Sequence, residues 1–119
     1  MIQFTQMPDT SPRQEKASQA SVLALLIEAL KRYGAVKIIL FGSAARGDAD
    51  AESDLDVIAV VPTSKPFISR LAEVVTYLPP GFPQVDILVY TPSEYSAMLD
   101  QEHPFLTRAL AEGRMLYEA

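Results

Sequence analysis

The sequence of 119 residues contains no cysteine, no tryptophan and a single histidine, His103. Without cysteine, the chain can form no disulfide framework, no thiolate zinc site and no cysteine nucleophile. Any bound metal ion must therefore use oxygen ligands or His103. His103 directly precedes Pro104, a context that favours a position at the start of a helix over a catalytic role.

Basic residues are also few: 10 Lys and Arg stand against 15 Asp and Glu, which gives a formal net charge of -5. Nucleic-acid binding depends largely on neutralising phosphates with Lys and Arg, so strong nucleic-acid binding is not expected. No apolar run approaches the roughly 18 to 20 residues that cross a bilayer, and residues 1–16 lack the pattern of a secretory signal. These absences predict a cytoplasmic protein that does not bind membranes.

The hydrophobic content of 49% is typical of a globular protein with one core. We expect residues 1–16 to form a flexible or pairing arm and residues 17–119 to form a single domain, with homo-oligomerisation left open. Helical spacing and β-branched runs predict, in order, a helix at 17–33, strands at 36–41 and 55–61, a helix from 66 to about 78, a strand at 84–90, helices after 92 and 104, and a strand at 114–118. This order predicts the α/β class, with a small mixed sheet flanked by helices.

In the helix that begins at Pro66, apolar residues recur on one face. That face is expected to lie in the core and to carry no chemistry. Its members are Phe67, Leu71, Val74 and Val75.

The stretch from Gly42 to Val61 combines a glycine turn, several acids and an apolar tail. Gly42 and Gly47 have the spacing of a P-loop, but Asp48 and Ala49 follow where Lys and Ser or Thr are required. An EF-hand register also fails, because its turn glycine is replaced by Ser53. Neither of these two ligand loops explains the stretch.

Asp54 and Asp56 are two residues apart at the start of a predicted strand, so their side chains are expected on one face. Two carboxylates so close repel each other unless a cation lies between them, and Mg²⁺ binds through carboxylates and phosphate oxygens. The turn at Gly42 and Ser43 offers backbone N–H groups and a hydroxyl to phosphates. Together these features predict a nucleoside triphosphate bound through its metal.

Asp86 interrupts the apolar run of residues 85–89, where an unpaired ionised acid would be costly to bury. If its strand lies beside the strand of Asp56, Asp86 completes a trio of acids. Two metal ions held there would activate an attacking hydroxyl and stabilise the leaving pyrophosphate. Arg46 suits either a phosphate or a carboxylate that orders the loop, and Ser53 suits either the site or a turn.

The joint pattern resembles the nucleotidyltransferase superfamily of DNA polymerase beta and, within it, the minimal nucleotidyltransferases. It consists of Gly42-Ser43, ten residues that include Arg46, Gly47 and Ser53, then Asp54-x-Asp56 and the later acid Asp86. The resemblance covers roughly residues 18–117. It implies the polymerase beta-type nucleotidyltransferase fold. It also implies that Ser43 contacts the triphosphate, that Asp54 and Asp56 bind Mg²⁺, and that Asp86 is the third acid.

Many members of the resembled family act as antitoxins of a HEPN-domain ribonuclease toxin. The resemblance therefore implies transfer of AMP, or another nucleoside monophosphate, from ATP to a hydroxyl, with a tyrosine of the toxin as the acceptor. One alternative is an antitoxin that masks its toxin by binding alone. Another is a small-molecule nucleotidyltransferase, although such enzymes usually carry a further domain for which this sequence has no room.

Overall fold

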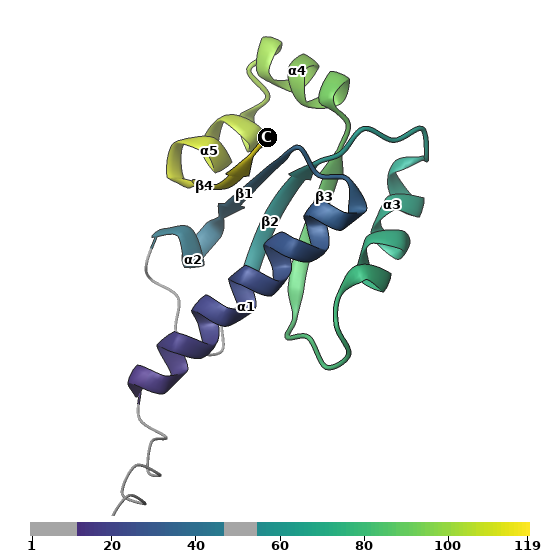
Figure 1. Cartoon of the computed structure of the whole chain (residues 1–119). Helices are drawn as coiled ribbons and strands as arrows, with labels where there is room; N and C mark the ends of the chain where they lie inside the picture. The colour runs from purple at the N-terminus through teal and green to yellow at the C-terminus, as the bar shows by residue number, and fades with distance from the viewer. Residues whose placement is uncertain (1–11, 47–54) are drawn as a thin grey trace, which may run out of the picture.

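The computed structural model describes residues 12–46 and 55–119 (Figure 1). The elements in chain order are α1 (Pro12–Tyr33), β1 (Lys37–Phe41), α2 (Gly42–Arg46), β2 (Leu55–Val60), α3 (Phe67–Val74), the 3₁₀ helix η2 (Val75–Tyr77), β3 (Val85–Tyr90), α4 (Pro92–Asp100), α5 (Pro104–Glu112) and β4 (Arg114–Glu118). None of the helices in this part of the chain combines the length and the apolar character that a membrane crossing needs.

The four strands form one mixed sheet in the order β3-β2-β1-β4. β2 is parallel to β3, whereas β1 is antiparallel to both β2 and β4. The predicted α/β class and mixed sheet are confirmed. The two central strands, β1 and β2, are the most apolar because both of their faces are covered.

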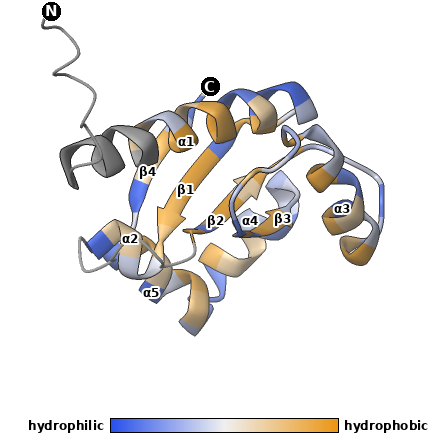
Figure 2. Ribbon diagram, turned by 90° about the horizontal axis from the view of Figure 1, so that it is seen from below, coloured by the Kyte–Doolittle hydropathy of each residue, from blue (hydrophilic) through white to orange (hydrophobic). Residues whose placement is uncertain are grey.

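Each face of the sheet carries its own apolar core (Figure 2). Leu26 and Leu30 of α1 pack with Val57 of β2 on one face. On the other face, Tyr95 of α4 and Leu106 of α5 pack with alternate residues of the same strands. This alternation follows from the period of two in a strand, and it determines the face from which each acid of β2 and β3 projects.

Most predicted boundaries agree with the structure to within one residue, but α1, α3 and the segment after β1 differ more. α1 begins at Pro12 rather than at residue 17, so it includes the last residues assigned to the N-terminal arm. Proline is well tolerated in the first turn of a helix because its missing N–H would have no intrahelical partner there. Gly42 and Ser43, expected to form a turn, begin the short helix α2. The remaining arm residues, 1–11, lie outside the described residues.

The prediction for the apolar face of α3 was wrong. Phe67, Leu71 and Val75 are 43%, 48% and 48% exposed, and only Val74 of that stripe is fully buried. The side chain that turns inward beside Val74 is Arg70, which is 5% exposed. A charged residue can face the interior here because other segments of the chain supply acceptors for its hydrogen bonds.

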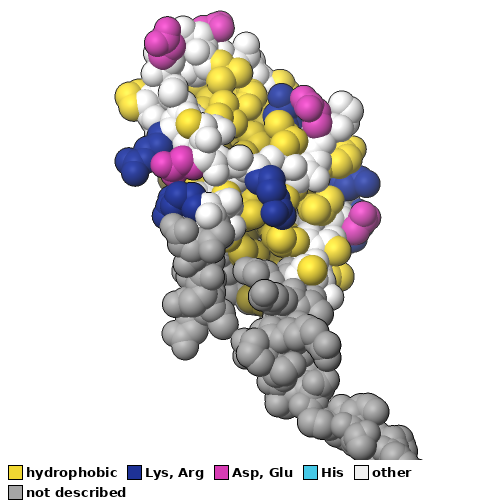
Figure 3. Space-filling model, turned by 90° about the vertical axis from the view of Figure 1, so that its left-hand side faces the viewer, with side chains coloured by type: hydrophobic (Ala, Val, Ile, Leu, Met, Phe, Trp, Pro, Cys, Tyr) yellow, Lys and Arg dark blue, Asp and Glu magenta, His cyan; other side chains and the backbone are white. Residues whose placement is uncertain are grey.

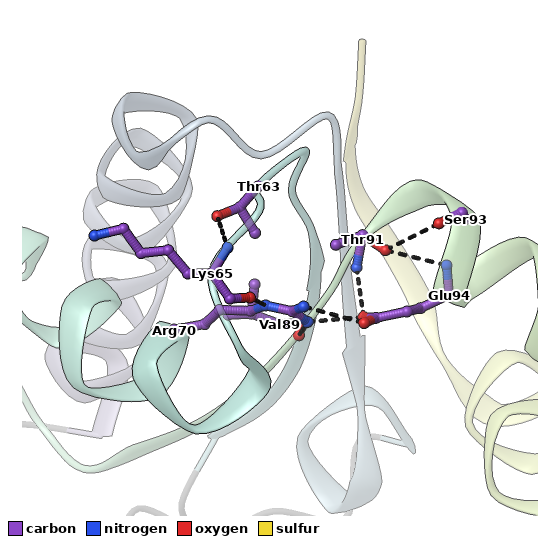
Figure 4. A network of polar contacts seen from close by, with 7 residues as sticks. All are labelled: Thr63, Lys65, Arg70, Val89, Thr91, Ser93 and Glu94. Carbon is purple, nitrogen blue, oxygen red and sulfur yellow. Dashed lines mark hydrogen bonds and ion pairs between the residues drawn. The ribbon is translucent and has the colours of Figure 1, made fainter.

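Arg70 is held by a network that joins α3 to β3 and α4 (Figure 4). Its two terminal nitrogens donate to the carboxylate of Glu94 at 2.7 and 3.0 Å, and Nη1 also donates to the carbonyl of Val89. Its Nε donates to the carbonyl of Lys65 at 2.8 Å. Glu94 in turn accepts the backbone N–H of Thr91 in the capping box of α4. The hydrogen bonds that Arg70 donates hold the pKa of Glu94 below its usual range, and the same hydrogen bonds raise the pKa of Arg70.

Candidate functional site

Asp56 of β2 and Asp86 of β3 lie directly opposite each other in the parallel pairing of these strands. Opposed residues of neighbouring strands project from the same face of the sheet, so the two carboxylates share one surface. The predicted adjacency of the two strands is therefore confirmed. The argument from burial was wrong, because Asp86 is exposed near the start of an edge strand. Because water can reach the carboxylate of Asp86, its charge carries no desolvation cost that a metal ion would have to offset.

Gly42 brings the main chain against the carboxylate of Asp56. Its φ of +75° is a conformation that glycine adopts without steric cost. A Cβ atom at this position would lie 2.5 Å from Oδ2 of Asp56. The glycine that ends β1 is thus required both by the backbone conformation and by this close approach.

Ser43 and Arg46 both belong to α2, which begins at Gly42. Ser43 is half-buried, one residue from the contact between Gly42 and Asp56. Arg46 is exposed, and its Nη1 donates to Oε1 of Glu112 in α5 at 3.1 Å. Arg46 was predicted to contact either a phosphate or a carboxylate. The structure contains an ion pair with the carboxylate of Glu112, which links α2 to α5.

Asp54 and Ser53 lie outside the described residues. In the part of the chain that the structure does describe, no group of three His, Cys, Asp or Glu residues is close enough to hold a metal ion. That part contains two members of the predicted acidic trio, Asp56 and Asp86, at neighbouring positions.

His103 takes the predicted place at a helix start, as the N-cap residue of α5. Its side chain makes no capping hydrogen bond, and its buried Nδ1 has no hydrogen-bond partner among the described residues. Its ring instead packs edge to face against Phe105, with ring centroids 6.4 Å apart. These contacts place His103 in the packing of α5 against its neighbours.

Beside Gly42 is a pocket of about 200 Å³ that sequence reasoning missed. It lies between the end of β1, α2 and α5, and is lined by Phe41, Gly42, Arg46, Phe105, Arg108, Ala109 and Glu112. Figure 3 looks onto this side of the molecule, where charged side chains of both signs lie beside hydrophobic ones. No spacing in the sequence links α5 with residues 41–46, because packing over more than 60 residues of chain brings them together.

Comparison with known proteins connects this geometry to a family. Residues 23–78 match the family model of the nucleotidyltransferase domain. The fold resembles the crystal structure of a candidate nucleotidyltransferase from Sulfolobus solfataricus, with a TM-score of 0.54 and 23% sequence identity over 75% of this chain and 84% of that one. No curated protein matches the sequence significantly.

The matched residues include β1, Gly42, Ser43 and Asp56, whereas Asp86 and the helices α4 and α5 follow the matched part. The family match covers slightly less than half of the chain, and the structural neighbour shares its fold.

Proposed function

We propose that this chain is a Mg²⁺-dependent nucleotidyltransferase that moves AMP, or another nucleoside monophosphate, from a nucleoside triphosphate to a hydroxyl group. The hydroxyl oxygen forms a bond to the α-phosphorus, and the bond from the α-phosphorus to the bridging oxygen breaks to release pyrophosphate. The observation that carries the proposal is the opposed pair Asp56 and Asp86, with the backbone of Gly42 packed against the first carboxylate. Two acids on one surface beside a glycine-serine segment suit a metal-bound triphosphate better than they suit a purely structural role.

The residues present fit a divalent cation, since two carboxylates on one face supply the hard oxygen donors that Mg²⁺ prefers. Asp56 and Asp86 would hold the metal, together with Asp54 of the same sequence motif. A bound Mg²⁺ would neutralise charge on the phosphates and favour ionisation of the attacking hydroxyl. Asp86, which is open to solvent, would accept the proton of that hydroxyl. Gly42 leaves room for phosphate oxygens, and Ser43 would donate its hydroxyl to them.

The proposed acceptor is a tyrosine of a HEPN-domain toxin, so that the transfer makes this chain an antitoxin. The support is the resemblance of the motif to minimal nucleotidyltransferases, together with the exposed position of Asp86. An exposed carboxylate is accessible to a side chain presented by another protein.

Incubation of the chain with α-labelled ATP, Mg²⁺ and a HEPN partner tests the proposal. We expect label on the partner, and we expect EDTA, Asp54→Asn, Asp56→Asn and Asp86→Asn each to abolish it. Asp100→Asn at the end of α4 is the matched control, because it removes an acid away from the site. Unlabelled partner that still binds the wild type and all three variants equally would overturn transfer and favour masking by binding alone.

A further inference from the structure

The pocket beside Gly42 adjoins the proposed reaction site. Gly42 lines the pocket and also touches the carboxylate of Asp56. Phe41, at the pocket wall, is directly opposed to Asp56 in the antiparallel pairing of β1 and β2. Directly opposed residues have Cβ atoms about 5 Å apart and project from one face of the sheet. A ligand whose phosphate lies at Asp56 could therefore extend into this pocket.

The pocket combines aromatic rings with guanidinium groups. Phe105 of α5 packs edge to face on Phe41, with centroids 5.5 Å apart and planes at 84°, and it remains 37% exposed. Arg108 is one helical turn further along the same helix, with 80% of its side chain exposed. Aromatic faces and arginine planes are the side-chain surfaces on which nucleobases stack.

Glu112 holds the two arginines of the pocket in place. Its Oε1 accepts from Nη1 of Arg46 at 3.1 Å, and its Oε2 pairs with Nε of Arg108 at 3.6 Å. Because a carboxylate already orients both arginines, they lose less side-chain entropy when they engage a ligand.

We propose that this pocket binds the base of the nucleoside triphosphate, which stacks on Phe105 and Arg108, while Glu112 positions the arginines. The inference rests on the proposed function and extends it to α5, which lies outside the segment that matches the nucleotidyltransferase domain. The part of the chain that binds phosphate and metal would thus differ from the part that binds the base.

Isothermal titration with two ligands tests the inference on the full chain: a non-hydrolysable ATP analogue and inorganic tripolyphosphate, each with Mg²⁺. Phe105→Ala and Arg108→Ala should each weaken analogue binding about 5- to 100-fold, the loss expected of a stacking partner. Tripolyphosphate binding should change less than twofold. Phe105→Leu keeps apolar packing against Phe41 and should show the same selective loss, which separates stacking from misfolding. Phe67→Ala, which removes a similarly exposed ring from α3, is the matched control.

The outcomes separate the two proposals. A base subsite is supported if the α5 variants lose binding of the ATP analogue but keep binding of tripolyphosphate, while the Phe67 variant binds both ligands as the wild type does. Equal affinity of the wild type for both ligands, or unchanged analogue binding in the α5 variants, overturns the subsite and leaves the proposed transfer standing. A wild-type chain that binds neither ligand overturns the proposed function together with the subsite.

Discussion

The main chain at Gly42 lies so close to Asp56 that a single added methyl group would reach within 2.5 Å of the carboxylate oxygen Oδ2. Gly81 has the same φ of +75° but open space where its Cβ would be. The two glycines therefore share a left-handed φ but differ in what a side chain would meet. This difference makes it possible to separate backbone strain from displacement of the acid.

We expect Gly81→Ala to lower the free energy of unfolding by about 1 to 2 kcal/mol, the cost of a left-handed residue, without changing nucleotidyl transfer. Gly42→Ala should cost at least as much and also slow transfer about 100-fold, because it moves Asp56 by a substantial part of an ångström. Urea unfolding and the label-transfer rate measure the two effects. Equal transfer rates in the two variants would contradict this account of Gly42.

Mg²⁺ should raise the melting temperature of the wild-type chain, since a ligand that binds only the folded state stabilises it. Asp56→Asn and Asp86→Asn should each reduce that increase, while Asp100→Asn should leave it unchanged. Thermal denaturation with Mg²⁺ and with EDTA gives the comparison. A melting temperature that responds to Mg²⁺ equally in all four proteins would place the metal elsewhere.

Glu94→Gln should lower the free energy of unfolding by about 2 kcal/mol. Breaking a buried ion pair leaves a buried charge uncompensated, and the partial exposure of Glu94 reduces that cost. Glutamine can still accept the hydrogen bond of the capping box of α4. The loss of stability therefore measures the unpaired charge of Arg70 rather than the loss of the cap. Glu28→Gln breaks the exposed pair with Lys31 at 3.8 Å and should cost less than about 0.5 kcal/mol. Denaturant titration of both variants tests the contrast.

Alkaline pH should destabilise the fold through Tyr33. Burial and the 2.9 Å hydrogen bond that its hydroxyl donates to Glu73 raise the pKa of Tyr33 to about 12, from an ordinary value of 10. Because the folded state favours the protonated phenol, this contribution is complete below pH 10 and is lost as the pH rises from 10 towards 12. Tyr33→Phe should flatten that part of the stability profile. Absorbance titration of the tyrosines should also lose its highest-titrating component.

The outer face of α3 should tolerate polar substitutions. Ile68 is 81% exposed, so Ile68→Ser is expected to change stability by less than about 0.5 kcal/mol. Val74→Ala, at a fully buried position on the same helix, should cost about 2 kcal/mol. Thermal unfolding distinguishes the two positions. A large loss in the Ile68 variant would mean that this face is covered in solution.

Most of the fold could be predicted from the sequence because local signals agree. Apolar β-branched runs indicated the strands, and prolines at 92 and 104 indicated where α4 and α5 begin. The inward face of α3 could not be predicted, because the partners of buried Arg70 include Glu94, which is 24 residues away. Periodicity cannot detect such pairing.

The candidate site was predictable to a similar extent. The predicted adjacency of the strands that carry Asp56 and Asp86 is confirmed, although the burial expected for Asp86 is not found. No sequence pattern indicated the pocket on α5, because Phe105 and Arg108 line it only after the fold brings them beside Gly42. Asp54 and Ser53, which lie outside the described residues, stay predictions.

The position of β1 between β2 and β4 also affects how the protein is made. β1 carries Gly42 at its end, yet one of its two hydrogen-bonded neighbours, β4, is formed by residues 114–118. During translation, β1 must wait for more than 70 further residues before its second edge is paired, and such distant contacts form slowly. We infer that the end of the sheet beside Gly42 reaches its final structure only after residues 114–118 have been synthesised.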